Sequence, residues 1–125
     1  MILGTGIDIV EVSRITQSLE RFGDRFLKRI LLPAEMAYCQ SHKVMAPHVA
    51  GRFAAKEAIS KAFGTGIGKH LGWLDMEVVR KDSGEPYVVL HGAGLDLLSM
   101  RGASKVHISL SHTQVYATAV ALLEG

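Results

Sequence analysis

A segment in the middle of the chain joins an alanine-rich helical pattern directly to a run of glycines. It comprises residues 52–61 (RFAAKEAISK), followed without interruption by residues 62–68 (AFGTGIG). At about 100° per residue, the charged side chains share one half of such a helix and the alanines fill most of the other half. Phe53 falls in the middle of the charged half, which is unusual for a face that meets only water. We therefore expect this face to be covered by a ligand or by protein.

The glycines indicate a loop that approaches a ligand. Gly64 can end the helix in a left-handed conformation, but Gly66 and Gly68 exceed what a helix cap needs. Glycine lets the backbone come close to a ligand, and successive amides in turn conformations can hold phosphate. The loop has neither the ending of a P-loop nor the spacing of a dinucleotide fold. On helix spacing alone, Glu57 and Lys61 could equally form an exposed pair worth only ~0.2–0.5 kcal/mol.

Asp8 lies in an apolar segment, Ile2–Val10, which predicts a strand buried on both faces. An isolated buried carboxylate is costly and takes up a proton unless a cation or several donors accompany it. Asp8 and Glu57 could therefore hold a divalent cation on a polyphosphate. The alternative is that Asp8 ends the strand and caps the helix expected to begin near Ser13.

Taken together, these motifs closely resemble those of the holo-acyl-carrier-protein synthases, the small phosphopantetheinyl transferases. The resemblance covers essentially the whole chain, from residues 4–15 through the central helix and glycine run to residues 109–113 (SLSHT). It implies transfer of the 4′-phosphopantetheine arm of coenzyme A to a serine of an acyl carrier protein. Mg²⁺ would be the cofactor, adenosine 3′,5′-bisphosphate the second product, and fatty acid biosynthesis the process served.

The resemblance also implies roles for particular residues. Asp8 and Glu57 are expected to be the Mg²⁺ ligands, with water and phosphate oxygens completing the coordination. Glu57 and Lys61 are expected to be catalytic, because phosphoryl transfer depends mainly on positioning and on neutralising charge. Glu57 acting through a metal-bound water, or a water alone, could be the general base. Lys56 shares the charged face but could equally be structural. The residues expected to bind coenzyme A are Arg52, Lys61, Gly64, Thr65, Gly66, Ile67, Gly68 and His112.

A homotrimer with active sites at the subunit junctions is a further implication of the resemblance. Because acyl carrier proteins are acidic, a basic surface should border each site. Arg14, Arg21 and Arg25, with Lys28, would align on one side of a continuous helix. Arg14 also matches a carrier-contacting position of the family. Acidic residues are interspersed in this segment, so a solvated surface of mixed charge is the alternative.

Composition limits the possible functions. The 125 residues allow a single domain, residues 1–125, and the net charge of +2 is too small to predict nucleic-acid binding. Cys39 is the only cysteine, which suits the cytoplasm, and Cys39, His42 and His48 are too loosely spaced to predict a metal site. No export signal or membrane-spanning segment is expected. The competing hypothesis is a non-catalytic module that binds a phosphorylated nucleotide or RNA, but it leaves Asp8 and Glu57 without a purpose.

The order of predicted elements is that of an α+β protein with a mostly antiparallel sheet. Helices are predicted near Ser13, which can cap the first of them, around Phe26–Leu31, and over Pro33–Gln40, His48–Phe63 and Leu95–Met100. Further strands are predicted over Met76–Arg80, Tyr87–His91, Val106–Leu110 and Tyr116–Leu123. The residues between the first two of these strands are typical of a hairpin turn.

Overall fold

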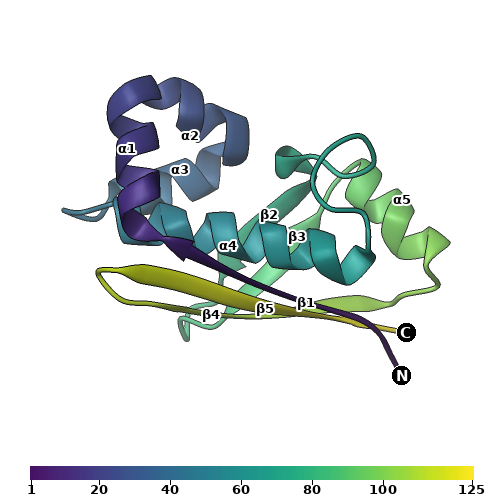
Figure 1. Cartoon of the computed structure of the whole chain (residues 1–125). Helices are drawn as coiled ribbons and strands as arrows, with labels where there is room; N and C mark the ends of the chain where they lie inside the picture. The colour runs from purple at the N-terminus through teal and green to yellow at the C-terminus, as the bar shows by residue number, and fades with distance from the viewer.

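Figure 1 shows the computed structural model, which describes all residues 1–125. The elements are β1 (Ile2–Glu11), α1 (Val12–Phe22), α2 (Asp24–Ile30), α3 (Pro33–Gln40), α4 (Ala46–Phe63), η1 (Trp73–Asp75), β2 (Met76–Arg80), β3 (Pro86–Leu90), α5 (Ala93–Met100), β4 (Lys105–His112) and β5 (Tyr116–Glu124). This arrangement confirms the predicted α+β class and most of the predicted elements. No helix combines the length and the apolar composition that crossing a lipid bilayer requires.

Helix α4 is the centre around which the other elements pack. An antiparallel sheet in the order β1-β5-β4 lies against one side of α4, and an antiparallel β2-β3 pair lies on another side. Helices α1 to α3 cover the N-terminal half of α4, while α5 lies beyond its C-terminal end (Figure 1). Alanines on α4 and on β5 face each other and are almost fully buried, so the helix and the sheet pack closely.

Strand β1 crosses α4 at a distance that only glycine allows. A Cβ atom added at Gly4 would lie 2.1 Å from the carbonyl oxygen of Ala62, and one at Gly6 would lie 1.9 Å from that of Ala58. Both distances are far below any possible contact, so side chains at these positions would push the strand off the helix. Since alternate residues of a strand share a face, Asp8 lies on the same side of β1 and faces α4.

The charged face of α4 is covered, as predicted, but mostly by other parts of the chain. Arg52, Lys56 and Ser60 are all buried within the protein, and the ring of Phe53 packs against Trp73 with centroids 4.9 Å apart. Only Glu57 and Lys61 of the charged residues on this helix remain accessible. The surface available to a ligand is therefore smaller than the helical pattern suggests.

Three predictions about the N-terminal region were wrong. Strand β1 is not buried on both faces, because no element covers the outer face of its sheet, where Ile7 is 67% and Ile9 65% exposed. Ser13 does not cap α1, since β1 leads directly into a helix that begins at Val12. The alignment of Arg14, Arg21, Arg25 and Lys28, which required one continuous helix, also fails, because Gly23, with φ of 57°, ends α1 and starts α2 in a new direction.

Candidate active site

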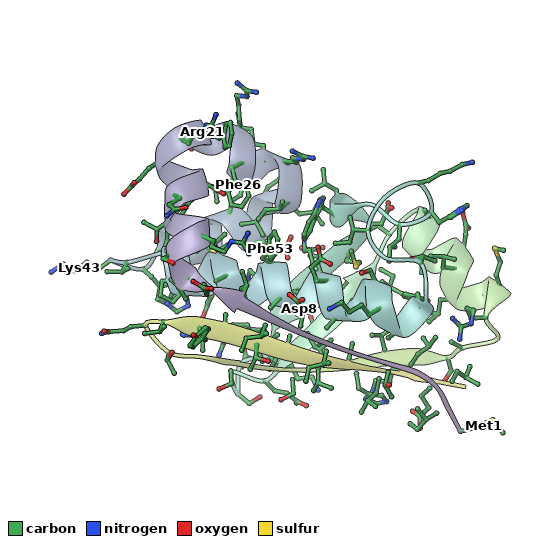
Figure 2. The ribbon with its side chains drawn as sticks, viewed as in Figure 1. Met1, Asp8, Arg21, Phe26, Lys43 and Phe53 are labelled. Carbon is green, nitrogen blue, oxygen red and sulfur yellow. The ribbon has the colours of Figure 1, made fainter.

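Asp8, Glu57 and Lys61 come together where β1 crosses α4 (Figure 2 labels Asp8). Lys61 Nζ donates hydrogen bonds to Asp8 Oδ1 at 3.1 Å and to the backbone oxygen of Ile7 at 2.9 Å. Burial and the nearby Asp8 carboxylate raise the pKa of Glu57, and Lys61 partly opposes this. The alternative of a Glu57–Lys61 pair along the helix is not what the structure shows, because Lys61 pairs with Asp8 instead. Two carboxylates and one ammonium therefore share a small, half-buried region.

This donor set fits Mg²⁺ only if other oxygens complete its coordination. No group of three or more histidine, cysteine, aspartate or glutamate side chains in the chain could hold a metal ion. Mg²⁺ is commonly bound by one or two carboxylates together with water and substrate phosphates. Burial and the neighbouring Asp8 carboxylate both raise the pKa of Glu57, and a cation bound between the two carboxylates would relieve their repulsion. Asp8 and Glu57 thus suit a cation that arrives with a phosphorylated ligand.

The glycine loop starts directly beyond Lys61. Gly64 ends α4 in the left-handed conformation with φ of 82°, and the amides of Thr65 and Gly66 both donate to the Ser60 carbonyl at 3.1 and 3.2 Å. Gly66 is also left-handed, with φ of 65°, and has open space where a side chain would be. The side chain of Ile67 packs against the core, so only its backbone can face a ligand. The Gly68 amide also donates within the chain, to the Leu71 carbonyl at 2.9 Å, so what the loop offers a ligand is open space at Gly66 rather than a set of free amides.

Arg52 and His112 line a different pocket, of about 290 Å³, on the other side of α4. Arg52 Nη1 donates to the His48 carbonyl at 3.3 Å, while its buried Nε has no hydrogen-bond partner. Burial, followed by the nearby His42, His112, Arg52 and Arg80, lowers the pKa of His48 to about 4. The pocket contains two guanidinium groups and two histidines, of which His48 is held neutral by burial and by its cationic neighbours. Such a pocket suits an anion. The lining residues are His48, Gly51, Arg52, Arg80, Gly84, Pro86, Leu110, Ser111 and His112.

The sequence analysis missed His48 and Arg80 as members of this pocket. His48 precedes Arg52 by four residues on α4, so helical spacing could have placed the two side chains on one face. Arg80 gave no such signal, because the β2-β3 hairpin reaches the pocket only through the tertiary fold. Cys39 has no comparable role: it is fully buried, and burial raises the pKa of its thiol to about 11.

The cluster of Asp8, Glu57 and Lys61 and the pocket of Arg52 and His112 lie at opposite edges of one sheet. Asp8 pairs with Ala119 of β5, whereas His112 pairs with Ala117 on the other side of the same strand. With β5 between them, β1 and β4 are the two edge strands of this sheet. The chain therefore brings Asp8, Glu57 and Lys61 together, and Arg52 and His112 together, but it does not join the two groups.

Lys56, the remaining cation of the central motif, is structural. Its Nζ atom donates to Glu35 Oε1 at 2.8 Å, to the Ile30 carbonyl at 2.6 Å and to the Trp73 carbonyl at 3.1 Å. Both charged side chains are completely inaccessible to solvent. These three acceptors satisfy the ammonium group, so Lys56 is not available to a ligand and instead ties α4 to α2, α3 and η1.

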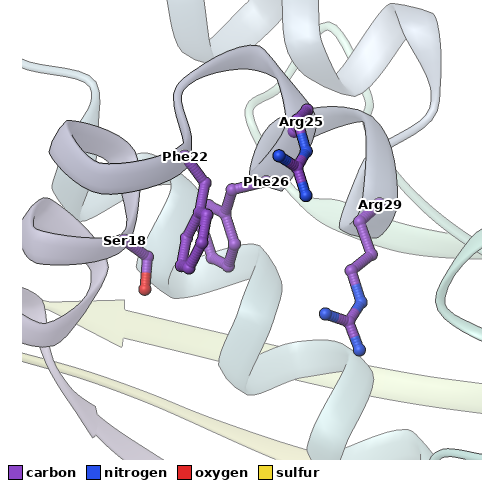
Figure 3. Close-up of a pocket in the computed structure, with 5 residues that line it drawn as sticks. All are labelled: Ser18, Phe22, Arg25, Phe26 and Arg29. Carbon is purple, nitrogen blue, oxygen red and sulfur yellow. The ribbon is translucent and has the colours of Figure 1, made fainter.

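The predicted docking residues are exposed on the outer helices. Arg14 and Arg21 lie on α1, seven residues apart and therefore on one side of that helix, and Arg25 lies on α2. Between the two helices is a pocket of about 290 Å³ lined by Ser18, Phe22, Arg25, Phe26 and Arg29. Figure 3 shows the phenyl rings of Phe22 and Phe26 pointing the same way, with the arginine side chains extending from α2. This surface combines an apolar floor with flanking positive charge.

Comparison with known proteins decides the family. The sequence model of the 4′-phosphopantetheinyl transferase superfamily matches residues 4–121. The chain belongs to this superfamily. It is 53% identical to a holo-[acyl-carrier-protein] synthase from Koribacter versatilis over 124 residues, which cover 99% of each chain. A holo-[acyl-carrier-protein] synthase from Chlamydia trachomatis is 50% identical over 121 residues, covering 97% of this chain and 98% of the relative.

Solved structures of transferases from this superfamily share the whole fold. The crystal structure of holo-[acyl-carrier-protein] synthase from Neisseria meningitidis has a TM-score of 0.93 and 34% identity, and the match covers 100% of both chains. The enzyme from Helicobacter pylori, in complex with coenzyme A, has a TM-score of 0.86 and 34% identity, covering 96% of this chain and 99% of that one. The predicted family and the predicted enzyme class are thereby confirmed.

Proposed function

We propose that this protein transfers the 4′-phosphopantetheine arm of coenzyme A to a serine of an apo acyl carrier protein. The observation that carries the proposal is the meeting of Asp8, Glu57 and Lys61 beside the left-handed glycine loop. Carboxylates repel a polyphosphate unless a cation lies between them, so this group favours a Mg²⁺-dependent reaction over simple anion binding. The reaction would take place in the cytoplasm and supply holo carrier for fatty acid biosynthesis.

The proposed chemistry needs little from the protein beyond positioning and charge. The carrier serine oxygen forms a bond to the phosphorus that bears the pantetheine arm, and the bond from that phosphorus to the bridging oxygen breaks. Adenosine 3′,5′-bisphosphate leaves with the electron pair, and the serine proton passes to Glu57 or to water. Lys61 offsets charge as it develops on the phosphate oxygens, while the open space at Gly66 lets the loop backbone approach them. Mg²⁺, held by Asp8 and Glu57, would supply further positive charge at the pyrophosphate.

The direct test mixes the protein with coenzyme A, Mg²⁺ and an apo acyl carrier protein. We expect the mass of the carrier to rise by that of one phosphopantetheine group, and the rise to disappear when EDTA is added. A carrier whose mass is unchanged at high enzyme concentration would contradict the proposal. A mass increase that is insensitive to EDTA would contradict only the metal requirement.

We further propose that the protein works as a homotrimer with sites between subunits. The pocket of Arg52 and His112 is cationic enough to hold a phosphate of coenzyme A, yet it lies at the opposite sheet edge from Asp8. A partner chain could place its own pocket against the Asp8 edge of its neighbour, and such head-to-tail contacts close into a ring. The uncovered outer face of the sheet, with Ile7, Ile9 and Val120 exposed, provides apolar surface for this contact.

Mixing two inactive variants tests this arrangement. Asp8→Asn disables one edge and His112→Asp disables the other, so each homotrimer should be inactive. In a ring-shaped trimer each shared site combines the Asp8 edge of one subunit with the His112 edge of the next. When the two variants mix at random, about one quarter of these sites have both edges unmutated, so activity should be about one quarter of wild type. The measurement is transferase activity after co-refolding the variants in equal amounts. Activity no greater than the sum of the two separate variants would rule out shared sites.

Arg14 and Arg21 are expected to act in carrier docking. Arg14→Glu and Arg21→Glu should each raise KM for the acidic carrier about tenfold at low salt, because charges at a rim mainly affect encounter. The KM for coenzyme A should not change. Lys105→Glu, a charge reversal at the opposite end of the molecule, is the matched control. Equal carrier KM values for the Arg14, Arg21 and Lys105 variants would refute docking at α1.

A further inference from the structure

Arg101 connects three elements that are far apart in the sequence. It follows α5, and its guanidinium group donates to the carbonyl of Phe63 at the end of α4 and to the carbonyl of Leu3 in β1, the latter at 3.1 Å. Its Nη1 atom lies 3.9 Å from the position where Gly64 would carry a Cβ atom. The last carbonyls of a helix lack partners within the helix and carry partial negative charge, so a guanidinium group is a favourable donor there.

The contact with Leu3 falls at an irregularity in the sheet. Ile2 pairs with Glu124 and Gly4 with Leu123, so Leu3 is an extra residue without a partner on β5. Such a bulge leaves a backbone group free of the sheet, and Arg101 satisfies the free carbonyl. Beyond the bulge, Gly4, Gly6 and Asp8 pair with the β5 residues that face α4. A shift of one residue in the pairing of β1 with β5 would turn Asp8 to the opposite face of the sheet, away from Glu57.

We infer that Arg101 is a positioning residue that fixes β1, the end of α4 and the start of the glycine loop relative to one another. One planar group with two parallel donors can hold the bulge and the helix end in a fixed geometry, which a single-point lysine cannot do equally well. Arg101 thereby keeps Asp8 facing Glu57 and fixes where the glycine loop leaves the end of α4. This role rests on the proposed function, because it concerns the geometry at the phosphates of coenzyme A.

The test compares Arg101→Ala, Arg101→Lys and the control Lys105→Ala, which removes an exposed positive charge without a carbonyl partner. For Arg101→Ala we expect kcat/KM for coenzyme A to fall roughly 10- to 100-fold, because small misplacements at a phosphoryl-transfer site are costly. The KM for the carrier should stay within about twofold, since α1 and α2 are not touched. For Arg101→Lys, kcat/KM for coenzyme A should lie between the values for wild type and Arg101→Ala. Low-millimolar guanidinium should partly restore kcat/KM of Arg101→Ala. A purely structural defect would not be rescued, because guanidinium favours unfolding.

Amide hydrogen exchange on the free protein gives a readout that does not need activity. In Arg101→Ala, residues 3–8 and 64–68 should exchange at least about tenfold faster, while α1 and α3 keep their protection. Wild-type protein that fails to modify the carrier would refute the proposed function but leave this measurement valid. Exchange and coenzyme A kinetics within about twofold of wild type would overturn the role of Arg101.

Discussion

Glu57→Gln and Asp8→Asn are expected to lower kcat by roughly 100- to 1,000-fold, because each removes a preorganised charge at the reacting phosphates. The measurement is carrier modification at saturating coenzyme A over a range of Mg²⁺ concentrations. Lys61 remains in both variants, so any residual rate reports what the ammonium group and the loop achieve alone. Near-normal turnover of either variant at low Mg²⁺ would show that these carboxylates do not hold the cation.

The same substitution at Glu57 should stabilise the metal-free protein. Since the fold raises the pKa of Glu57, the folded state disfavours its ionised form, and wild type loses stability as pH rises through that pKa. With EDTA present, the Tm of Glu57→Gln should therefore lie about 1–4 °C above that of wild type near pH 8. Near pH 4 the two proteins should have about the same Tm. Asp8→Asn should give no such gain, because it leaves Lys61 without its partner. A lower Tm for Glu57→Gln near pH 8 would contradict the charge balance described here.

Lys56→Met should have the largest effect on stability. It leaves the completely buried Glu35 carboxylate without a counter-charge, which costs about 3–5 kcal/mol. For a chain of this size the Tm should fall by about 10–20 °C, measured by thermal denaturation followed by circular dichroism.

Lys61→Met is the matched control for that variant. It removes a lysine one turn further along α4, but the Lys61 side chain is 49% exposed, so the loss should stay below about 1 kcal/mol. The two variants should separate cleanly: Lys56→Met loses stability, and Lys61→Met loses activity while remaining folded. Adding Glu35→Gln to Lys56→Met should recover part of the loss, because the stranded charge is removed. A Tm for Lys56→Met within a few degrees of wild type would refute this account.

Local patterns predicted the elements but not which surfaces remain free. The period of the central segment was enough to predict α4, and the glycine that ends it behaves as expected. The same period could not tell that α1 to α3 fold over Arg52 and Lys56, because burial of one helix face depends on distant residues such as Glu35. For the same reason, Lys56 and Lys61 look equivalent in the sequence but have opposite roles in the structure.

The candidate site shows the same limit. Asp8 stood out because a carboxylate is unusual in an apolar strand, and Glu57 and Lys61 stood out by helical spacing. Nothing in the sequence separates these residues from Arg52 and His112, which the sheet order places at the other edge. His48 could have been found by its helical spacing from Arg52, whereas Arg80 and Arg101 act through contacts made by the tertiary fold, which neither spacing nor neighbouring residues predict.

The pairing of β1 with β5 sets the order in which the protein can form during synthesis. β1 is the first strand to leave the ribosome and β5 the last, and the two chain ends lie together, with the Gly125 amide donating to the Met1 carbonyl at 2.9 Å. The central strand of the sheet is therefore missing until all four other strands have been synthesised. Helices α1 to α4 can form early from local contacts, whereas β1 must wait for its partner. A nascent chain thus carries Asp8 on an unpaired strand, and the candidate site can be completed only after β5 has emerged.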